Sequence, residues 1–233
     1  RPSQMLRSLV GSEMCIRDRV FTKIIREITV AVKLAGPDIS SNSRLRLAMT
    51  KANKNSVPKD TIERAIKKGS GQSDSSFEEI TYEGYGPKGI AVIIECLTDN
   101  KNRTVSEVRH ALTKYNGSLG TKGSVSHLFK KVGILTVIDT TEDDLINLID
   151  DVEILDYEQT GNDCIINTEP TNLFTVKTFF ESKSIKTKDE ELILEPTTMC
   201  DIGESDLEQV EMFTDNLEDL DDVQNIYTNI NII

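Results

Sequence analysis

The stretch that decides the fold of this chain runs from Tyr82 to Thr104. It reads YEGYGPKG at 82–89, then the apolar run IAVIIEC at 90–96, then LTDNKNRT at 97–104. Glycine tolerates positive φ and proline fixes φ at about −65°, so the first part predicts a tight turn between two strands. The β-branched run predicts a buried strand. The polar residues after it predict a loop that opens a helix, and such loops on rigid scaffolds often carry function.

Residues 20–69 are predicted to form a basic head of three helices. Apolar side chains recur at the helical period from Phe21 to Ala35, and Gly36-Pro37 ends this pattern. The second helix is expected from about Asn42 to Asn55, with Leu45, Ala48 and Ala52 among its inward residues.

The third helix is expected to begin at Asp60, because Asp60 and Glu63 have the spacing of a capping box. Gly69 suits the C′ position just past its end, where a left-handed residue is common. Residues 70–76 contain glycine, serine, glutamine and aspartate with no apolar pattern. A linker is therefore predicted over residues 70–77, between the head and the rest of the chain.

Two groups of elements are expected after the linker. The first group consists of strands over 80–85 and 90–98, a helix that Thr104 and Glu107 would cap, a glycine-rich turn over 117–123 and a strand over 125–131. The second group has the order strand, helix, strand, strand, helix, strand of a split βαβ unit. Its elements are expected at 134–138, 142–151, 153–158, 163–168, 172–182 and 185–193.

The C-terminal residues contain an extended stretch over 197–202, a helix that Ser205 and Glu208 would cap, and a strand over 223–230. These elements have no partners of their own, so we expect them to return to the sheet of residues 78–132. The predicted fold class is α+β, with a three-helix head and a discontinuous α/β middle domain that carries an inserted ferredoxin-like (βαββαβ) domain. The predicted bounds are 20–69 for the head, 78–132 plus 194–233 for the middle domain and 133–193 for the acidic ferredoxin-like domain.

Charge is divided unevenly along the chain. The whole sequence has a net charge of −12. Residues 1–77 contain 15 Lys/Arg and 7 Asp/Glu, whereas residues 134–233 contain 4 Lys/Arg and 26 Asp/Glu. A basic head joined to an acidic tail favours a polyanion as the partner of the head, since phosphate would repel the tail. The alternative is that these charges serve solubility alone.

Nucleic-acid binding is the function that this charge pattern favours. Lysine and arginine neutralise phosphate and release counterions, and in the first and third helices they lie opposite the apolar residues. Arg103, in the polar loop, can bind a phosphate through two parallel hydrogen bonds. For each cation taken singly, the alternative is a solvated side chain or an ion pair. The candidate binding residues are Lys23, Arg26, Lys33, Arg44, Arg46, Lys51, Lys54, Lys59, Arg64, Lys67, Lys68 and Arg103.

Five more residues in the decisive stretch are candidates for contact with a partner. Tyr82 and Tyr85 can stack on bases, or they can pack beside the turn. Asp99, Asn100 and Asn102 can contact a partner or cap the helix that follows them. Because one side chain is enough for a cap, capping alone does not account for all three.

Catalysis is not expected from this sequence. His110 and His127 are the two histidines, and neither has a cysteine or carboxylate at metal-ligand spacing. His127 is expected to alternate with Val125 and Phe129 on a strand and to pack there. The sequence contains no GxSxG, Walker A or GxGxxG motif, and its four cysteines form no CxxC pair. We therefore expect no enzyme, no metal site and no cofactor.

Several segments of the chain resemble the YebC/PmpR family, which includes the mitochondrial translational activator of cytochrome oxidase. The resemblance runs from about Phe21 to the C-terminus. Besides residues 82–104, it is carried by FTKIIREI at 21–28, NSRLRLA at 42–48, PKDTIERAIKKG at 58–69 and LEDLDDVQ at 217–224. Residues 1–19 lack the basic, Trp-containing opening of the family and look like translated sequencing adapter, so we interpret them as a non-native leader.

The resemblance implies a three-domain layout and a cytoplasmic, non-enzymatic regulator of gene expression. It leaves two roles open: a transcriptional regulator that binds promoter DNA, and a translation factor that binds RNA or the ribosome. The sequence has no clear helix-turn-helix reading helix, which favours recognition by shape and charge. A protein-interaction scaffold that acts through the acidic half is the alternative. A membrane is not expected as a partner, because no apolar run approaches the roughly 20 residues of a membrane span. A small-molecule substrate is not expected either, because no catalytic set was found.

Overall fold

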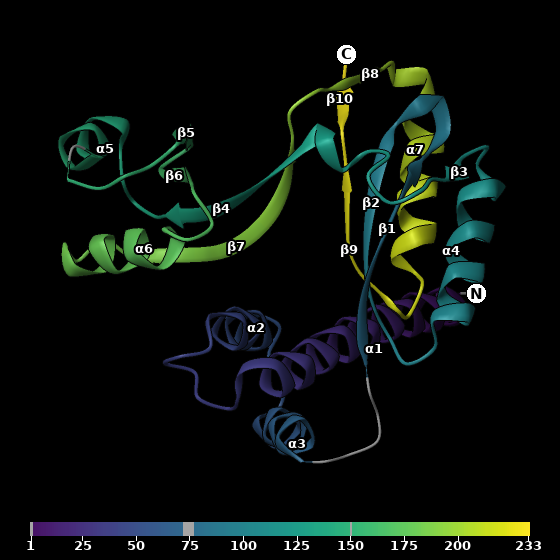
Figure 1. The fold of residues 1–233 in the computed structure, drawn as a ribbon, viewed down its shortest axis with the longest axis horizontal. Coiled ribbons are helices and arrows are strands. Elements are labelled where there is room, and N and C mark those ends of the chain that lie inside the picture. Colours follow the sequence, from purple (N-terminus) through teal and green to yellow (C-terminus); the bar gives the residue numbers. More distant parts are fainter. Residues whose placement is uncertain (1, 72–76, 150) are drawn as a thin grey trace.

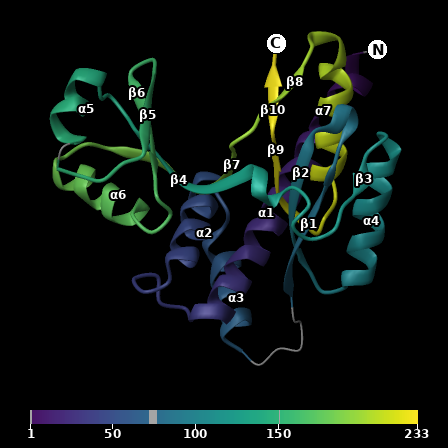
Figure 2. The same ribbon diagram turned by 45° about the horizontal axis from the view of Figure 1, so that its top comes forward.

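The computed structural model describes residues 2–71, 77–149 and 151–233, which form three lobes (Figures 1 and 2). The first lobe is the head, and it contains α1 (Pro2–Ala35), α2 (Ser43–Lys54) and α3 (Lys59–Ser70). Its core gathers apolar side chains from all three helices, among them Ile28, Leu45 and Ile62. Most of the predicted linker lies outside the described residues, and residues 2–19, which we interpreted as a leader, belong to α1.

Asn42 fixes the turn between α1 and α2. Its side-chain oxygen accepts a hydrogen bond from the Leu45 amide at 3.0 Å and so caps α2. Its side-chain nitrogen donates to the carbonyls of Ala31 and Gly36, each at 2.8 Å. One buried asparagine therefore satisfies backbone groups at the end of one helix and at the start of the next. The predicted end of the first helix at Gly36-Pro37 and the predicted start of the second near Asn42 are both confirmed.

The predicted ends of α3 were wrong. Its N-cap residue is Pro58, and no side chain caps it, so Asp60 and Glu63 do not form a capping box. Gly69 lies inside the helix rather than beyond it. A Cβ atom at Gly69 would lie 2.6 Å from the Thr29 carbonyl oxygen and 2.8 Å from Cβ of Val32. Glycine is required there because α3 approaches α1 closely, and not because the backbone turns.

The middle domain is built on a four-stranded sheet in the order β3-β1-β2-β9. Its strands are β1 (Glu78–Tyr85), β2 (Ala91–Thr98), β3 (Ser118–Leu119) and β9 (Val223–Thr228). The turn between β1 and β2 contains Gly89 with φ +82°, the conformation for which the sequence predicted a glycine. β9 pairs antiparallel with β2, which confirms that the end of the chain returns to this sheet.

Helices α4 (Lys101–Lys114) and α7 (Glu204–Glu218) pack on the sheet of the middle domain through Leu112 and Phe213. Their predicted caps were wrong. Asn100 caps α4 with its side chain, and Thr104 is instead buried inside the first turn. The N-cap residue of α7 is Gly203, with no side-chain hydrogen bond to the helix. β8 (Cys200–Ile202), which precedes α7 in the chain, pairs in parallel with β10 (Ile230–Ile232).

The third lobe is a ferredoxin-like domain, as predicted. Its elements are β4 (Phe129–Val137), α5 (Glu142–Ile149), β5 (Asp156–Thr160), β6 (Asp163–Thr168), α6 (Leu173–Ser182) and β7 (Thr187–Pro196). The strand order is β5-β6-β4-β7, and neighbouring strands are antiparallel. The long strands β4 and β7 run from this domain back to the middle domain (Figure 1). The fold class is thus a three-helix head with a discontinuous middle domain and a ferredoxin-like insertion.

The predicted strand over 125–131 was wrong in its first half. Residues Ser126–Leu128 form a 3-10 turn, and the strand begins only at Phe129. His127 therefore does not alternate with Val125 on a strand, and it is exposed whereas Val125 is buried. The exact domain bounds given above stay a prediction. No helix in the described part of the chain has the length and apolar character needed to cross a membrane.

Candidate nucleic-acid interface

The cations of the head fall into two sets, and the first set is open to solvent. Lys33 lies in the last turn of α1, Lys59 begins α3, and Arg64 and Lys67 follow on α3. All four residues are exposed, and none of them has a carboxylate within ion-pair distance among the described residues. We call these four residues the open set. Lys68 lies beside them, with its Nζ 5.6 Å from the ring centre of Phe77.

The second set of cations is bound to other groups of this same chain, most of them carboxylates. Arg44 donates from Nε to Glu27 at 2.6 Å and also pairs with Glu79. Lys51 and Lys54, on α2, pair with carboxylates of β7 in the ferredoxin-like domain. Arg46 donates to two backbone carbonyls, and its guanidinium lies over the ring of Phe174 at 4.0 Å. The contacts of Lys51, Lys54 and Arg46 with the ferredoxin-like domain thus lie between two lobes, although the side chain of Lys54 remains 60% exposed.

Lys23 and Arg26, on α1, reach the segment that joins α7 to β9. Lys23 donates from Nζ to the Glu218 carbonyl at 2.9 Å. Burial lowers the pKa of Lys23, although nearby carboxylates partly oppose this effect. Arg26 donates from Nη1 to the Asp221 carbonyl at 2.5 Å and to Oδ1 of Asp222 at 3.0 Å. The first helix is thereby tied to the C-terminal part of the middle domain.

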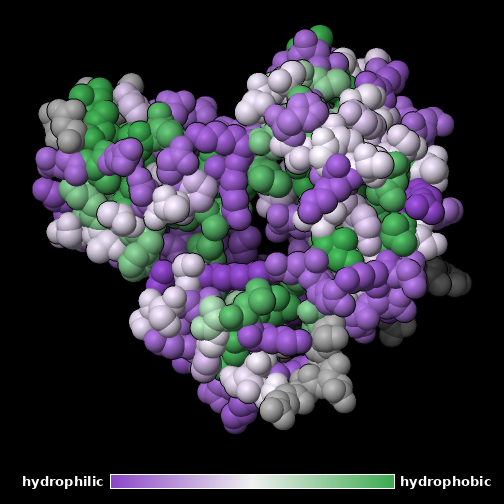
Figure 3. Space-filling view, viewed as in Figure 1, coloured by the Kyte–Doolittle hydropathy of each residue, from purple (hydrophilic) through white to green (hydrophobic). Residues whose placement is uncertain are grey.

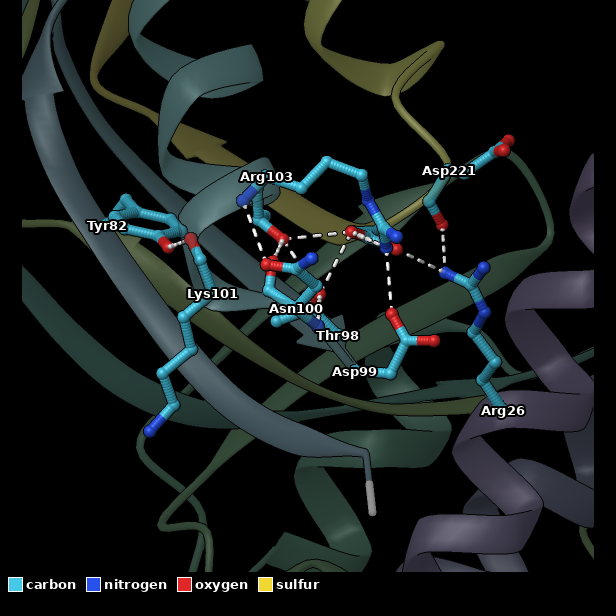
Figure 4. A network of polar contacts seen from close by, with 10 residues as sticks. Arg26, Tyr82, Thr98, Asp99, Asn100, Lys101, Arg103 and Asp221 are labelled. Carbon is cyan, nitrogen blue, oxygen red and sulfur yellow. Dashed lines mark hydrogen bonds and ion pairs between the residues drawn. The ribbon is translucent and has the colours of Figure 1, made fainter. Parts of the chain in front are cut away.

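Figure 4 shows a polar network between the head and the middle domain, with Arg26 from α1 and Arg103 from α4. Asp222 is the centre of this network. Its side chain is 2% exposed and accepts from Arg26 at Oδ1. At Oδ2 it accepts from Nη2 of Arg103 at 2.8 Å, and the hydroxyls of Thr98 and Thr104 lie at 3.0 and 2.8 Å. Burial tends to raise the pKa of Asp222, but the hydrogen bonds from Arg103, Thr104 and Thr98 lower it further than burial raises it. The carboxylate is therefore held in its ionised form.

The polar loop at the start of α4 has intramolecular roles for most of its candidate residues. Asn100 caps the helix by accepting from the Arg103 amide at 3.1 Å. Asp99 pairs with Nη2 of Arg103 at 2.9 Å, and hydrogen bonds to Asp222 and Asp99 raise the pKa of Arg103. Asn102 is exposed, and its side chain makes no hydrogen bond within the described part of the chain. Of the three polar candidates, Asn102 is the one whose side chain stays available to a partner.

The two tyrosine candidates differ in exposure. Tyr82 is half-buried against the core of the middle domain, its hydroxyl donates to the Lys101 carbonyl at 3.5 Å, and burial raises its pKa. Tyr85 is 38% exposed, and its hydroxyl donates to the Ser124 carbonyl at 3.2 Å. Tyr85 is thus the more exposed of the two rings, and Tyr82 packs against the core of the middle domain and not beside the turn.

Glu83 and Asp222 are buried carboxylates that organise this region, and the sequence did not single them out. Glu83 is buried on β1 and accepts hydrogen bonds from the backbone amides of Gly123, Val125 and Ser126 at 2.7 to 2.9 Å. Burial tends to raise its pKa, and these backbone hydrogen bonds outweigh that effect and lower it. A glutamate among strand residues beside a glycine-rich turn was the available signal. Asp222 had a weaker signal, because four acidic residues crowd into 218–222 and spacing does not reveal which is buried.

A cleft of about 530 Å³ lies where the three lobes meet, and Figure 3 shows the hollow between them. Its lining includes Arg44 of the head, Glu95 of the middle domain and Glu191 of the ferredoxin-like domain. Glu95 accepts hydrogen bonds from Asn225 at 2.9 Å and Tyr227 at 3.3 Å. The carboxylates here are bound to side chains of the protein. Among the described residues, no group of three metal-ligating side chains is close enough to hold an ion.

Comparison with known proteins defines the class of this three-lobed α+β protein. A family model described as the TACO1/YebC protein N-terminal domain matches residues 11–72, and one described as the TACO1/YebC second and third domain matches residues 77–230. The first match begins inside the segment that we interpreted as a leader. The chain belongs to the TACO1/YebC family, as the resemblance indicated.

Curated relatives agree with this assignment over nearly their whole length. A protein of Idiomarina loihiensis is 44% identical over 93% of this chain and 88% of its own, and one of Coxiella burnetii is 44% identical over 91% and 88%. Both are named "Probable transcriptional regulatory protein". The crystal structure of a conserved hypothetical protein from Aquifex aeolicus matches with a TM-score of 0.83 and 40% identity, over 93% of this chain and 91% of that one.

Proposed function

We propose that this protein is a non-enzymatic regulator of gene expression that binds nucleic acid through the open set of the head. The observation that carries the proposal is the contrast between the two sets of cations. Arg44, Lys51 and Lys54 are neutralised by carboxylates of the chain, whereas Lys33, Lys59, Arg64 and Lys67 are exposed and have no such partner among the residues that the structure describes. Cations without an internal partner are the ones available to phosphate.

The open set supports contact with the phosphate backbone and not with base edges. α3 carries Asp60 and Glu63 beside Arg64 and Lys67, and it has no asparagine or glutamine, the residues that read adenine. Phosphate contacts position a protein on nucleic acid without carrying sequence information. We therefore propose binding by charge and shape, with little preference for one duplex sequence over another.

The family supports a regulatory role and leaves two targets. The names of the relatives point to transcription and therefore to promoter DNA, whereas binding by shape and charge suits ribosomal RNA at least as well. We place the activity in the cytoplasm, as the sequence predicts. Either target is reached through the same open set, so the two roles differ in what is bound and not in which face of the protein binds.

The experiment that tests the proposal compares three targets at physiological salt: a random DNA duplex, a promoter fragment of the same length, and purified ribosomes. We expect measurable binding to at least one of them, and affinities for the two duplexes that differ by less than about 10³-fold, the lower limit for specific DNA binders. Tighter binding to ribosomes than to both duplexes assigns the protein to translation. A promoter preference above that limit contradicts binding by charge and shape, and a failure to bind any target contradicts the proposed function.

A further inference from the structure

Two acidic side chains of the ferredoxin-like domain form ion pairs with lysines of α2. Nζ of Lys54 lies 2.7 Å from Oδ1 of Asp189, and Nζ of Lys51 lies 3.5 Å from Oε1 of Glu191. Both carboxylates belong to β7, which passes beside α2 in Figure 2. The strand thus occupies the space in front of the ammonium groups of these two lysines.

Because side chains alternate between the two faces of β7, both carboxylates point toward the head. Successive side chains of a strand point to opposite faces, so Asp189 and Glu191 share one face, about 6.6 Å apart along the strand. Glu190, between them, points the other way, where it is buried and pairs with Lys177 at 2.7 Å. The face of β7 that carries Asp189 and Glu191, its outer face, therefore presents one negative charge to each of the two lysines.

A third contact joins the same two lobes beside these ion pairs. The guanidinium of Arg46, on α2, lies over the ring of Phe174, on α6, at 4.0 Å from its centre. Phe174 is 50% exposed, so this contact covers only part of the ring. Arg46, Lys51 and Lys54 are thus all engaged by one acidic domain.

The contact between α2 and the ferredoxin-like domain is weak enough to open. The side chains of Lys51 and Glu191 are each 41% exposed, and ion pairs that are this exposed to water contribute little to stability. Among the described residues, the hydrophobic cluster of the head contains head residues alone, and that of the ferredoxin-like domain contains its own residues alone. No apolar core therefore holds the two lobes together at this point.

We propose that α2 carries a second phosphate-binding surface, made of Arg46, Lys51 and Lys54, which the ferredoxin-like domain covers until nucleic acid displaces it. β7 covers the two lysines, and Phe174 of α6 covers Arg46. The inference rests on the proposed function, because it concerns the same ligand. Phosphate oxygens replace the carboxylates of Asp189 and Glu191 one for one on the two lysines, and the ferredoxin-like domain moves off α2. The open set makes the first contact, and the covered surface adds to it only after the lobes part.

The test removes the competitor without touching the cations. The Asp189→Asn/Glu191→Gln variant is compared with Asp139→Asn/Glu158→Gln, which removes the same two charges from exposed residues of the same domain whose side chains do not contact α2. We expect the first variant to bind a random duplex and a single-stranded RNA of equal length about three- to tenfold more tightly than the control. The gain should disappear when Lys51→Gln/Lys54→Gln is added, since the cations are then gone.

Small-angle scattering without nucleic acid gives a readout that is independent of binding. The first variant should have a larger radius of gyration than the control, because β7 no longer holds α2. Equal affinities of the first variant and the control, with wild-type protein that binds, would overturn the covered surface and leave the proposed function standing. Absence of binding by every variant, with or without the change in radius, would overturn both.

Discussion

Arg26 on the first helix donates a hydrogen bond to Oδ1 of Asp222 at 3.0 Å, although the two residues are 196 positions apart in the chain. Asp222 also accepts from Arg103 at the start of α4. One buried carboxylate therefore joins the head to the middle domain. A buried charge with two cationic partners is costly to disturb, because removing one side leaves the other unpaired.

The Asp222→Asn substitution is expected to lower the free energy of unfolding by about 2 kcal/mol or more. The amide has the size of the carboxylate, but it cannot neutralise Arg26 and Arg103. The control is Asp221→Asn, which changes an exposed neighbour whose backbone carbonyl, and not its side chain, binds Arg26. Urea unfolding of both variants measures the difference. Equal stabilities of the two variants would show that the network does not hold the lobes together.

The Glu83→Gln substitution should make stability less sensitive to acid. The pKa of Glu83 is lowered in the folded protein, so its ionised form stabilises the fold above its unfolded-state pKa of about 4.3. This stabilisation is lost as the pH falls through the lower folded-state pKa. The difference in unfolding free energy between wild type and variant should be about 1–3 kcal/mol at neutral pH and should shrink below about pH 4. Glu158→Gln, at an exposed site, is the control. A difference that stays constant down to pH 3 would contradict the role given to the ionised carboxylate.

Gly69→Ala should destabilise the head, because the new Cβ would lie 2.6 Å from the Thr29 carbonyl oxygen. We expect a loss of about 1–3 kcal/mol in unfolding free energy, as for other overpacked sites. Gly71→Ala is the matched control, since its Cβ would meet no atom closer than 3.4 Å. Thermal unfolding followed by circular dichroism compares them. If both variants melt together, the contact between α3 and α1 is looser than the structure shows.

Asn102→Ala should separate the function of the polar loop from its structure. The side chain of Asn102 makes no hydrogen bond in the described part of the chain, so the melting temperature should change by less than about 1 °C, as for surface substitutions in general. Asn100→Ala removes the cap of α4 and should cost about 1 kcal/mol. If Asn102 contacts the partner, its variant binds nucleic acid or ribosomes more weakly at unchanged stability. Unchanged binding would leave the loop with a structural role alone.

Local patterns predicted much of the fold. Gly36-Pro37 marked the end of α1, and the order of strands and helices after Gly133 indicated the ferredoxin-like domain. The caps were harder to predict, because several polar residues stood near each helix start. At α4, Thr104 had the spacing of a capping residue, yet its hydroxyl is used by the buried network around Asp222 and Asn100 caps the helix instead. Tertiary contacts decided this choice, and local spacing did not contain them.

The candidate site shows the same limit. The sequence identified the cations of the head, but it could not separate Lys67, which is open to solvent, from Lys54, which pairs with Asp189 at 2.7 Å. Asp189 lies 135 positions further along the chain, so no helical or strand period links the two residues. Helix periodicity predicts which side of α2 faces outward, whereas the lobe that covers that side becomes visible only in the folded chain.

The salt dependence of nucleic-acid binding shows most directly whether the open set of the head binds phosphate. We would measure the affinity of wild type, Arg64→Glu/Lys67→Glu and Lys122→Glu/Lys186→Glu for a random duplex at several salt concentrations. The last variant reverses two exposed cations outside the head and is the matched control. Each lost phosphate contact should flatten the slope of log K against log salt by about 0.9. If the open set contacts phosphate, Arg64→Glu/Lys67→Glu should bind more weakly, with a slope flatter by about 1.8, and the control should stay close to wild type. Equal affinity and slope for the two variants would contradict the assignment of binding to the open set.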